Sequence, residues 1–314
     1  MTEDLSWELA IVGGGPAGMT AAIYAARYGL KTLLLESKVL GGAQATSPGI
    51  ENYPGFTFIV GIDLATRMKE QVKKSGAQIR EITEVKSVRG PEKSGEFILE
   101  TRRGNYSAHA VIVATGGGYM KLNIPGEEEL TGRGVSFCAT CDGPLFRGKT
   151  VAVIGGGNTA VTEALYLHEV AAKVYLIHRR DALKAVKAVQ DQLFKTDVEL
   201  IWNTTAKEFR GDQQIQEVLL ENVQTGETQS LVVDGVFVAL GSEPESTIIK
   251  AVGVATNRRG EIITDNNQMT SIPGIFAAGD VVASMKQIAV AVGQGAIAAD
   301  SAYRYLRSKK LGSM

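Results

Sequence analysis

The chain has 314 residues, enough for two domains of ordinary size, because single hydrophobic cores stop growing at about 250 to 300 residues. Its formal net charge is −1 and its Lys and Arg are dispersed, so the composition gives no indication of a nucleic-acid partner. No segment approaches the roughly 20 apolar residues of a membrane helix, and the acidic residues 1–8 do not resemble a secretory signal, so we expect a cytoplasmic protein with no membrane partner.

The first predicted elements form a βαβ unit. An apolar strand over residues 9–12 leads to a glycine turn, an alanine-rich helix that ends near residue 29 and a second strand over residues 32–35. A unit of this order is typical of dinucleotide-binding domains.

The glycine turn has the spacing GxGxxG. Gly13 allows the tight turn, Gly15 lets the backbone approach a pyrophosphate, and Gly18 lets the helix pack closely on the strand. Pro16 and Ala17 open the helix, whose N-terminal amides would face the phosphate charge. One such turn is a weak signal, because a ligand-free strand-to-helix turn has the same spacing.

An outer part of the same domain follows. Two loops contain Gly42 and Asn52, and a helix is predicted over residues 62–75. A β meander over residues 79–113 then leads to Ala114, Thr115 and Gly116.

Cys138 and Cys141 are the only two cysteines and lie near a predicted helix start. In a reducing cytosol such a pair more often exchanges disulfides or binds metal than it staples a fold, and a local positive potential lowers the thiolate pKa. We expect no metal site, because zinc needs four ligands and the histidines lack finger-like spacing; a buried inert pair is the remaining alternative. Asp142 comes next, where a carboxyl group could move the proton of thiol chemistry or cap the helix.

A second βαβ unit repeats the plan of the first. Its strands are predicted over residues 151–154 and 174–177, on either side of a helix that ends near residue 170. Its turn offers five candidate contacts: Gly155, Gly157, Asn158, Thr159 and Ala160. Two such units in one chain imply two dinucleotides.

The two units carry opposite charge at the end of their second strands. Glu36 and His178 each stand 23 positions after the first glycine of their turn, and Arg179 and Arg180 follow His178. A carboxylate there accepts hydrogen bonds from ribose hydroxyls and repels a 2′-phosphate, whereas arginines bind that phosphate. We therefore expect FAD in the first unit and NADPH in the second, although a solvated basic strand end has the same sequence.

The C-terminal part returns to the first domain. A strand over residues 274–278 ends at Gly279 and Asp280, where a carboxylate suits a ribityl hydroxyl, and a small-residue helix over residues 289–302 follows Gln287. The predicted fold is α/β, with two Rossmann-like, three-layer ββα dinucleotide-binding domains, the NADPH domain being inserted in the FAD domain. We expect the FAD domain over residues 1–116 and 245–314 and the NADPH domain over residues 117–244, with glycine-containing crossings near residues 116–118 and 241–244 that make a plausible hinge.

With these residues in hand, the whole chain resembles the low-molecular-weight thioredoxin reductases of bacteria and archaea. The motifs that carry the resemblance are GGGPAG at residues 13–18, ENYPG at 51–55, CATCD at 138–142, GGGNTA at 155–160, HRR at 178–180 and AGD at 278–280. Related reductases keep their cysteine pair in the FAD domain and are longer.

The resemblance implies a homodimer in which NADPH reduces FAD, and reduced flavin then reduces the Cys138–Cys141 disulfide. It also implies that Cys141 faces the flavin, that Cys138 attacks the disulfide of thioredoxin, and that Asp142 protonates the thiolate. The family rotates its nicotinamide domain between two orientations, one for each partner of the flavin.

Three positions depart from the family pattern. Lys184 stands where many members have a further arginine near the 2′-phosphate. The positive charge remains, but the paired N–H donors of a guanidinium group are lost. Ala43 follows Gly42 where a glutamine is common, and Gln44 comes one place later, so we do not assign that flavin contact. Ile288 replaces an alanine after Gln287, a change we expect the site to tolerate because the contact would be made by the backbone.

Three other functions compete with this prediction. The first is a flavin disulfide reductase that serves another dithiol protein, such as a glutaredoxin-like protein or a peroxidase system, or that takes electrons from NADH or ferredoxin. The second is a ferredoxin-NADP reductase, which would leave the cysteines idle. The third is a non-catalytic nucleotide-binding sensor, which would not turn over with NADPH and a disulfide.

Overall fold

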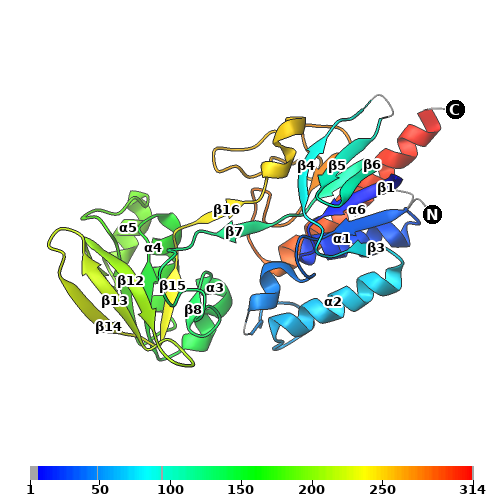
Figure 1. Cartoon of the computed structure of the whole chain (residues 1–314). Helices are drawn as coiled ribbons and strands as arrows, with labels where there is room; N and C mark the ends of the chain where they lie inside the picture. The colour runs from blue at the N-terminus through cyan, green and yellow to red at the C-terminus, as the bar shows by residue number, and fades with distance from the viewer. Residues whose placement is uncertain (1–5, 48, 93–94, 313–314) are drawn as a thin grey trace. The chain divides into compact units, whose positions relative to one another are not determined.

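The computed structural model describes residues 6–47, 49–92 and 95–312 (Figure 1). Two parts of the sequence analysis lie outside the described residues. They are residues 1–5, which belong to the segment used to predict a cytoplasmic protein, and Pro48 in the first loop. The chain divides into two compact units, the first made of Met1–Thr46, Tyr53–Gly118 and Glu243–Met314, and the second of Ser47–Asn52 and Tyr119–Ser242. The second unit thus interrupts the first in sequence.

The first unit is built on a seven-stranded sheet in the order β3-β2-β1-β6-β5-β4, with β17 also paired to β6. The strands are β1 (Ser6–Val12), β2 (Thr32–Leu35), β3 (Gln78–Arg80), β4 (Val85–Arg89), β5 (Phe97–Thr101), β6 (Gly104–Val113) and β17 (Ile275–Ala277). Strands β1, β2, β3, β6 and β17 run parallel, whereas β4, β5 and β6 form an antiparallel meander. The long β6 belongs to both, because its first half pairs with β5 and its second half with β17.

The predicted meander was therefore wrong at its start. Gln78–Arg80 pairs in parallel with β2, at the far side of the sheet from β4, and the meander begins only at β4. A three-residue strand carries too little alternation to distinguish a parallel edge from the first strand of a hairpin.

Helices cover the parallel strands of the first unit. They are α1 (Pro16–Arg27), α2 (Gly61–Ser75) and α6 (Ile288–Gly312), with the short η1 (Gly42–Thr46) and η3 (Thr247–Val252) in the loops. Helix α1 starts with Pro at its first turn and ends before Gly29, which has φ of +78°. A Cβ on Gly295 of α6 would lie 2.2 Å from the carbonyl oxygen of Ala17, so this glycine lets α6 and α1 pack in direct backbone contact.

The second unit has three layers. A five-stranded parallel sheet runs in the order β11-β10-β9-β15-β8, and a separate antiparallel sheet in the order β12-β13-β14. The strands are β8 (Val135–Ser136), β9 (Thr150–Ile154), β10 (Lys173–Ile177), β11 (Glu199–Ile201), β12 (Thr204–Arg210), β13 (Glu217–Asn222), β14 (Thr228–Val232) and β15 (Gly235–Val238). The helices are α3 (Ala139–Asp142), η2 (Gly143–Phe146), α4 (Asn158–His168) and α5 (Lys187–Leu193).

Alternation along the central strand β9 explains the layers. Val151 and Val153 lie in the core that the sheet shares with the helices, whereas Ala152 and Ile154 lie in the core between the two sheets. Successive side chains of a strand point to opposite faces, so one four-residue apolar run serves both cores. The parallel strands of both units, with their covering helices, confirm the predicted α/β fold.

The segments that connect the units pair with each other. Strand β7 (Gly117–Tyr119) pairs with β16 (Ser242–Pro244), and the amide of Met120 donates to the carbonyl of Gly241 at 2.9 Å. The chain therefore leaves and re-enters the second unit at one place.

Candidate functional site

The glycine turn of the first unit has one open side. Gly13 has φ of +108°, and a Cβ on it would lie 2.2 Å from the carbonyl oxygen of Ala114. A Cβ on Gly18 would lie 1.8 Å from the carbonyl oxygen of Gly13, so the helix start packs directly on the turn. A Cβ on Gly15 would meet only the Cα of Gly42, at 3.9 Å. The turn is thus closed at Gly13 and Gly18 and open at Gly15, where a pyrophosphate group fits.

Glu36 lies directly after β2, beside this turn. Its carboxylate accepts the backbone N–H of Gly14 at 2.7 Å and that of Lys38, also at 2.7 Å. These bonds fix the side chain at the turn, where it would meet the ribose hydroxyls of a dinucleotide.

The other candidate FAD residues of the first unit gather at the same ends of the parallel strands. The amide of Ala114 donates to the carbonyl of Val12 at 2.7 Å, at the ends of β6 and β1. A Cβ on Gly279, just after β17, would lie 2.9 Å from the Cβ of Ala17 in α1. Strand ends of a parallel sheet meet at one edge, and that edge is where open α/β sheets bind ligands.

The neighbours of these residues are also fixed. The Thr115 hydroxyl donates to the carbonyl of Glu245 at 2.6 Å, and the Gly116 carbonyl accepts the amide of Glu245 at 3.0 Å. Burial raises the pKa of Asp280, and the ammonium group of Lys286 opposes that change. The segment that follows is held by Lys286, whose ammonium donates to the carbonyls of Asp280 and Val282, both at 2.6 Å.

Two C-terminal candidates and one loop candidate complete the set. Gln287 directly precedes α6, its carbonyl accepts the amide of Ala291 at 2.9 Å, and Ile288 is the first residue of that helix. The loop candidate, Asn52, belongs to Ser47–Asn52, which groups with the second unit.

The second glycine turn has the same plan. A Cβ on Gly155 would lie 2.5 Å from the carbonyl oxygen of Ala239, whereas a Cβ on Gly157 would meet nothing within 4 Å. Ala160 replaces the third glycine and is fully buried, while Asn158 and Thr159 are exposed at the start of α4. The Asn158 side chain accepts the amide of Val186 at 2.7 Å. This turn also has room for a phosphate at its middle glycine.

His178 and the cations after it lie in different surroundings. The ring of His178 is buried against the turn, since a Cβ on Gly156 would lie 2.2 Å from its Cε1 atom. Its Nε2 atom has no hydrogen-bond partner among the described residues, and burial lowers its pKa. His178 is therefore neutral, and its ring packs against the backbone of the glycine turn at Gly156.

Three exposed cations surround the same turn. Arg179 and Arg180 are exposed just past β10, and the amide of Lys184 donates to the carbonyl of Gly156 at 2.7 Å. Within the described ranges, none of these three side chains has an ion-pair partner. Unpaired cations beside an open glycine turn suit a phosphate dianion.

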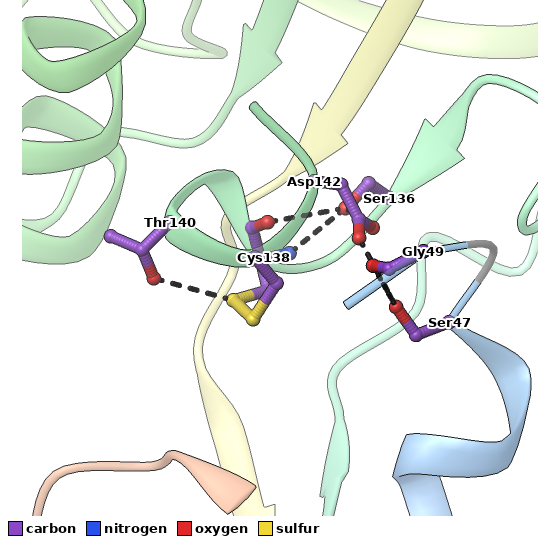
Figure 2. Close-up of a disulfide and its surroundings, with 7 residues drawn as sticks. Ser47, Gly49, Ser136, Cys138, Thr140 and Asp142 are labelled. Carbon is purple, nitrogen blue, oxygen red and sulfur yellow. Dashed lines mark hydrogen bonds between the residues drawn. A yellow bond between two sulfur atoms is a disulfide. The ribbon is translucent and has the colours of Figure 1, made fainter. Parts of the chain in front are cut away.

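Cys138 and Cys141 form a disulfide at the start of α3, with their Cα atoms 5.3 Å apart (Figure 2). Cys138 is the residue that precedes the first turn of the helix, and its carbonyl accepts the amides of Cys141 and Asp142 at 3.2 and 3.1 Å. The backbone of the pair is thus part of the helix start, as the sequence predicts.

Asp142 lies beside the disulfide and is largely buried. Its Oδ2 accepts the hydroxyl of Ser136 at 2.7 Å, and Ser47 Oγ lies 3.5 Å from Oδ1 (Figure 2). Burial raises the pKa of Asp142, and the hydroxyls of Ser136 and Ser47 oppose that change. Its side chain makes no capping bond to α3 or η2. A carboxyl group with a raised pKa holds its proton to a higher pH than an exposed one, which suits general acid chemistry.

Sequence reasoning missed a second acid, Glu163. It lies on α4, accepts the backbone N–H of Ala139, and burial raises its pKa to about 7. The sequence of α4 around it has no signal that distinguishes this carboxylate from a solvated one. Helix α3 packs on α4 and places the N–H of Ala139 against this carboxylate.

Residues 7–295 match the family described as pyridine nucleotide-disulphide oxidoreductase. The chain belongs to the pyridine nucleotide-disulphide oxidoreductase family. It is 41% identical to a thioredoxin reductase of Bacillus subtilis, over 98% of this chain and 96% of that protein. A solved thioredoxin reductase from Streptococcus pyogenes is 42% identical, covers 98% of this chain and 100% of its own, and has a TM-score of 0.92.

A third relative is named for ferredoxin. A solved structure titled ferredoxin-flavin thioredoxin reductase, from Clostridium acetobutylicum, is 31% identical over 98% of this chain and 99% of its own, with a TM-score of 0.54.

These relatives confirm the predicted resemblance. The chain is an oxidoreductase of this flavoprotein family, whose thioredoxin reductase members use FAD and NADPH. No helix in the described part of the chain is both long and apolar enough to cross a membrane.

Proposed function

We propose that the protein reduces the disulfide of thioredoxin with electrons from NADPH, which pass through FAD and the Cys138–Cys141 disulfide. The overall reaction consumes NADPH, one proton and thioredoxin disulfide, and yields NADP⁺ and thioredoxin dithiol. One observation carries this proposal: a disulfide that starts a helix, with the buried acid Asp142 beside it, in a unit that also contains a nucleotide-type glycine turn.

The first unit supplies the proposed FAD site. The open turn at Gly15 would hold the pyrophosphate, Glu36 the ribose and Asp280 a ribityl hydroxyl. The further contacts that we propose are Gly13, Pro16, Ala17, Gly18, Gly42, Asn52, Ala114, Thr115, Gly116, Gly279, Gln287 and Ile288. Bound FAD would supply the redox chemistry that links hydride donation by the nicotinamide to the reduction of a disulfide.

The second unit supplies the proposed NADPH site. Gly155, Gly157, Asn158, Thr159 and Ala160 would hold the pyrophosphate. Arg179, Arg180 and Lys184 would bind the 2′-phosphate, while His178 supports the turn.

The proposed FAD domain covers residues 1–116 and 245–314, and the proposed NADPH domain covers residues 117–244. Apart from Ser47–Asn52, which groups with the second unit, the borders of the two compact units lie within two residues of these limits, which supports the division.

Within the cysteine pair we assign distinct roles. Cys138 attacks the thioredoxin disulfide, Cys141 exchanges electrons with the flavin, and Asp142 gives a proton to the leaving thiolate. The raised pKa of Asp142 supports this role, since it favours the protonated form that can donate a proton. The family resemblance supports the division between the cysteines. We further propose that the protein acts as a homodimer in the cytoplasm.

A second proposal concerns the donor. The similarity to a ferredoxin-flavin thioredoxin reductase keeps ferredoxin as a candidate, whereas the unpaired Arg179 and Arg180 beside an open glycine turn favour NADPH. A glutaredoxin-like or peroxidase acceptor remains the alternative to thioredoxin.

An anaerobic titration tests the donor and the electron path together. The oxidised holoenzyme is titrated with NADPH and then with NADH, while flavin absorbance and free thiols are followed. We expect NADPH to bleach the flavin and to release the two thiols of the single disulfide. If neither nicotinamide bleaches the flavin, the donor assignment is wrong and ferredoxin replaces it.

A serine substitution tests the acceptor step. Cys138→Ser should still be bleached by NADPH but should not reduce thioredoxin. Unchanged thioredoxin turnover by this variant would remove the assigned role, and turnover only with other dithiol proteins would change the acceptor.

A further inference from the structure

Glu163 is connected to the redox helix through one backbone bond. Helices α3 and α4 pack on each other, and the carboxylate of Glu163 accepts the N–H of Ala139. Ala139 directly follows Cys138 and is fully buried in the same core as Ala160 and Ala164 of α4. A charge on Glu163 therefore acts on the helix turn that holds the cysteines.

The second carboxylate oxygen of Glu163 is unsatisfied. Its Oε2 atom is buried and has no hydrogen-bond partner among the described residues. An ionised carboxylate in such a place loses hydration that nothing replaces, whereas the neutral acid avoids most of that cost. Burial accordingly raises the pKa of Glu163 to about 7, against the opposing effect of the Ala139 N–H. Both protonation states are populated near neutral pH.

The fixed charges on the elements around Glu163 are largely neutralised. Helix α4 packs against α3, α5, β9 and β10. Cations on these elements and on α4 itself form the ion pairs Lys187–Asp191, Lys173–Glu199 and His168–Asp197. The remaining titratable groups are Tyr166 of α4, Tyr175 of β10, and, on and beside α3, Asp142 and the cysteines. Strand β9 carries no titratable side chain. Among these groups, the cysteine pair and Asp142 are the ones whose charge changes in the proposed turnover.

We propose that Glu163 is a positioning residue that holds the redox helix through Ala139 and takes up a proton when the Cys138–Cys141 disulfide is reduced. Two electrons break the S–S bond and give two thiolates. One proton from solvent then converts one of them to a thiol, so one thiolate remains. The new negative charge favours the neutral form of Glu163, so a second proton goes to its carboxylate. This inference deepens the proposed function and rests on it for its role in turnover, but its test needs neither NADPH nor thioredoxin.

The test is a redox equilibrium measured against pH. Holoenzyme is equilibrated with mixtures of reduced and oxidised dithiothreitol from about pH 6 to 8.5, quenched by alkylation, and the reduced fraction of the pair is read by mass spectrometry. The proteins compared are wild type, Glu163→Gln and the control Glu169→Gln, whose side chain is exposed just past the end of α4.

The ratio of the wild-type to the Glu163→Gln equilibrium constant should fall about tenfold across this range, which corresponds to one pKa unit of coupling. The control ratio should stay constant. A merely structural role would change the constant by the same factor at every pH, so a Glu163→Gln ratio that does not vary with pH overturns the proposal. Loss of thioredoxin turnover would leave this measurement unaffected, so failure of the proposed function is recognised separately.

An infrared measurement keeps the proposal testable if Glu163→Gln does not fold. Reduction of the wild-type protein at about pH 7.5 should increase the absorbance of protonated carboxyl groups. The increase should persist in Asp142→Asn, because Asp142 is the other buried acid at this helix. No increase in either protein would contradict proton uptake by Glu163.

Discussion

Two adjacent arginines, Arg179 and Arg180, should decide which nicotinamide cofactor the protein prefers. Both are exposed, and neither has an ion-pair partner within the described ranges. Each charge-assisted hydrogen bond lost on truncation costs about 1.5 to 3 kcal/mol. The double change Arg179→Ala and Arg180→Ala should therefore raise the Kd for NADPH by a factor of about 100 or more and change that for NADH by less than about threefold. Calorimetric titration of the oxidised protein measures both.

The chain offers a matched control for this change. Arg258 and Arg259 are also adjacent and exposed, but they lie in the first unit. Their replacement by Ala should leave both affinities unchanged. Equal losses for NADPH and NADH in the first variant would mean that the phosphate lies elsewhere.

Glu163 should also make stability depend on pH. Its pKa is 4.5 when unperturbed and about 7 in the folded protein, so the folded state binds more protons between these values. The free energy of unfolding therefore falls as the pH rises from about 4.5 to about 7, by about 3 kcal/mol. In Glu163→Gln this contribution is absent. Urea unfolding measures this at about pH 5 and pH 8. The free energy of unfolding of the variant, relative to that of wild type, should be higher at pH 8 than at pH 5. An equal difference between the two proteins at both pH values would contradict the raised pKa.

At the residue scale, the sequence predicted those groups whose chemistry is tied to a local motif. The cysteine pair, Asp142 and the glycines are recognisable because a CxxC or GxGxxG spacing is itself the functional geometry. Glu163 has no such motif, and its bond to the N–H of Ala139 arises from the packing of α3 on α4, two segments that are separate in sequence. His178 was predicted at its position among the basic residues, but its buried ring follows from contact with Gly156, which no spacing reveals.

At the element scale, the second glycine turn should be intolerant of a methyl group at Gly156. A Cβ there would lie 2.2 Å from the ring of His178, although the backbone conformation itself does not require glycine. Overpacking of this kind costs about 1 to 3 kcal/mol. Gly156→Ala should lower the free energy of unfolding by that amount, whereas Gly157→Ala, with nothing within 4 Å of its Cβ, should not show this loss.

A double-mutant cycle identifies the cause. His178→Ala removes the ring, so Gly156→Ala should cost much less in that background, with an interaction energy of about 1 to 3 kcal/mol. Additive losses would mean that the His178 ring is not what excludes the methyl group.

Elements with a strong local signal were predicted closely, and weakly patterned ones were not. Strand β2 was predicted at its observed bounds, and α1 and α4 were each predicted to end about two residues later than observed, because apolar runs and glycine turns bracket them. Strand β3 was assigned to the meander, since its partner β2 is distant in sequence. Strands β12 to β14 were expected only as a layer of the fold class, because individual antiparallel strands with exposed faces resemble loops in composition.

At the scale of the whole molecule, the insertion of one unit into the other is what the repeated βαβ plan implies. The first unit closes its sheet with β17, which follows the second unit in sequence, so neither half of the first unit is complete alone. By contrast, both cores of the second unit lie within the continuous segment Tyr119–Ser242, and Ser47–Asn52 contributes to neither. The two units should therefore differ in how they tolerate separation.

The second unit should fold when expressed alone as residues 119–242. Its ends are adjacent, as the bond from the amide of Met120 to the carbonyl of Gly241 shows, so excision leaves no long gap to close. Its parallel sheet is covered by helices on one face and by β12 to β14 on the other, and neither core uses a residue outside the segment. We expect cooperative urea unfolding, a dispersed amide NMR spectrum and the Cys138–Cys141 disulfide in the fragment. An N-terminal fragment of residues 1–118, which lacks β17 and α6, should remain unfolded because the last strand and its covering helix come from beyond residue 242. A folded N-terminal fragment, or an unfolded central one, would contradict this division of the chain into one interrupted and one continuous folding unit.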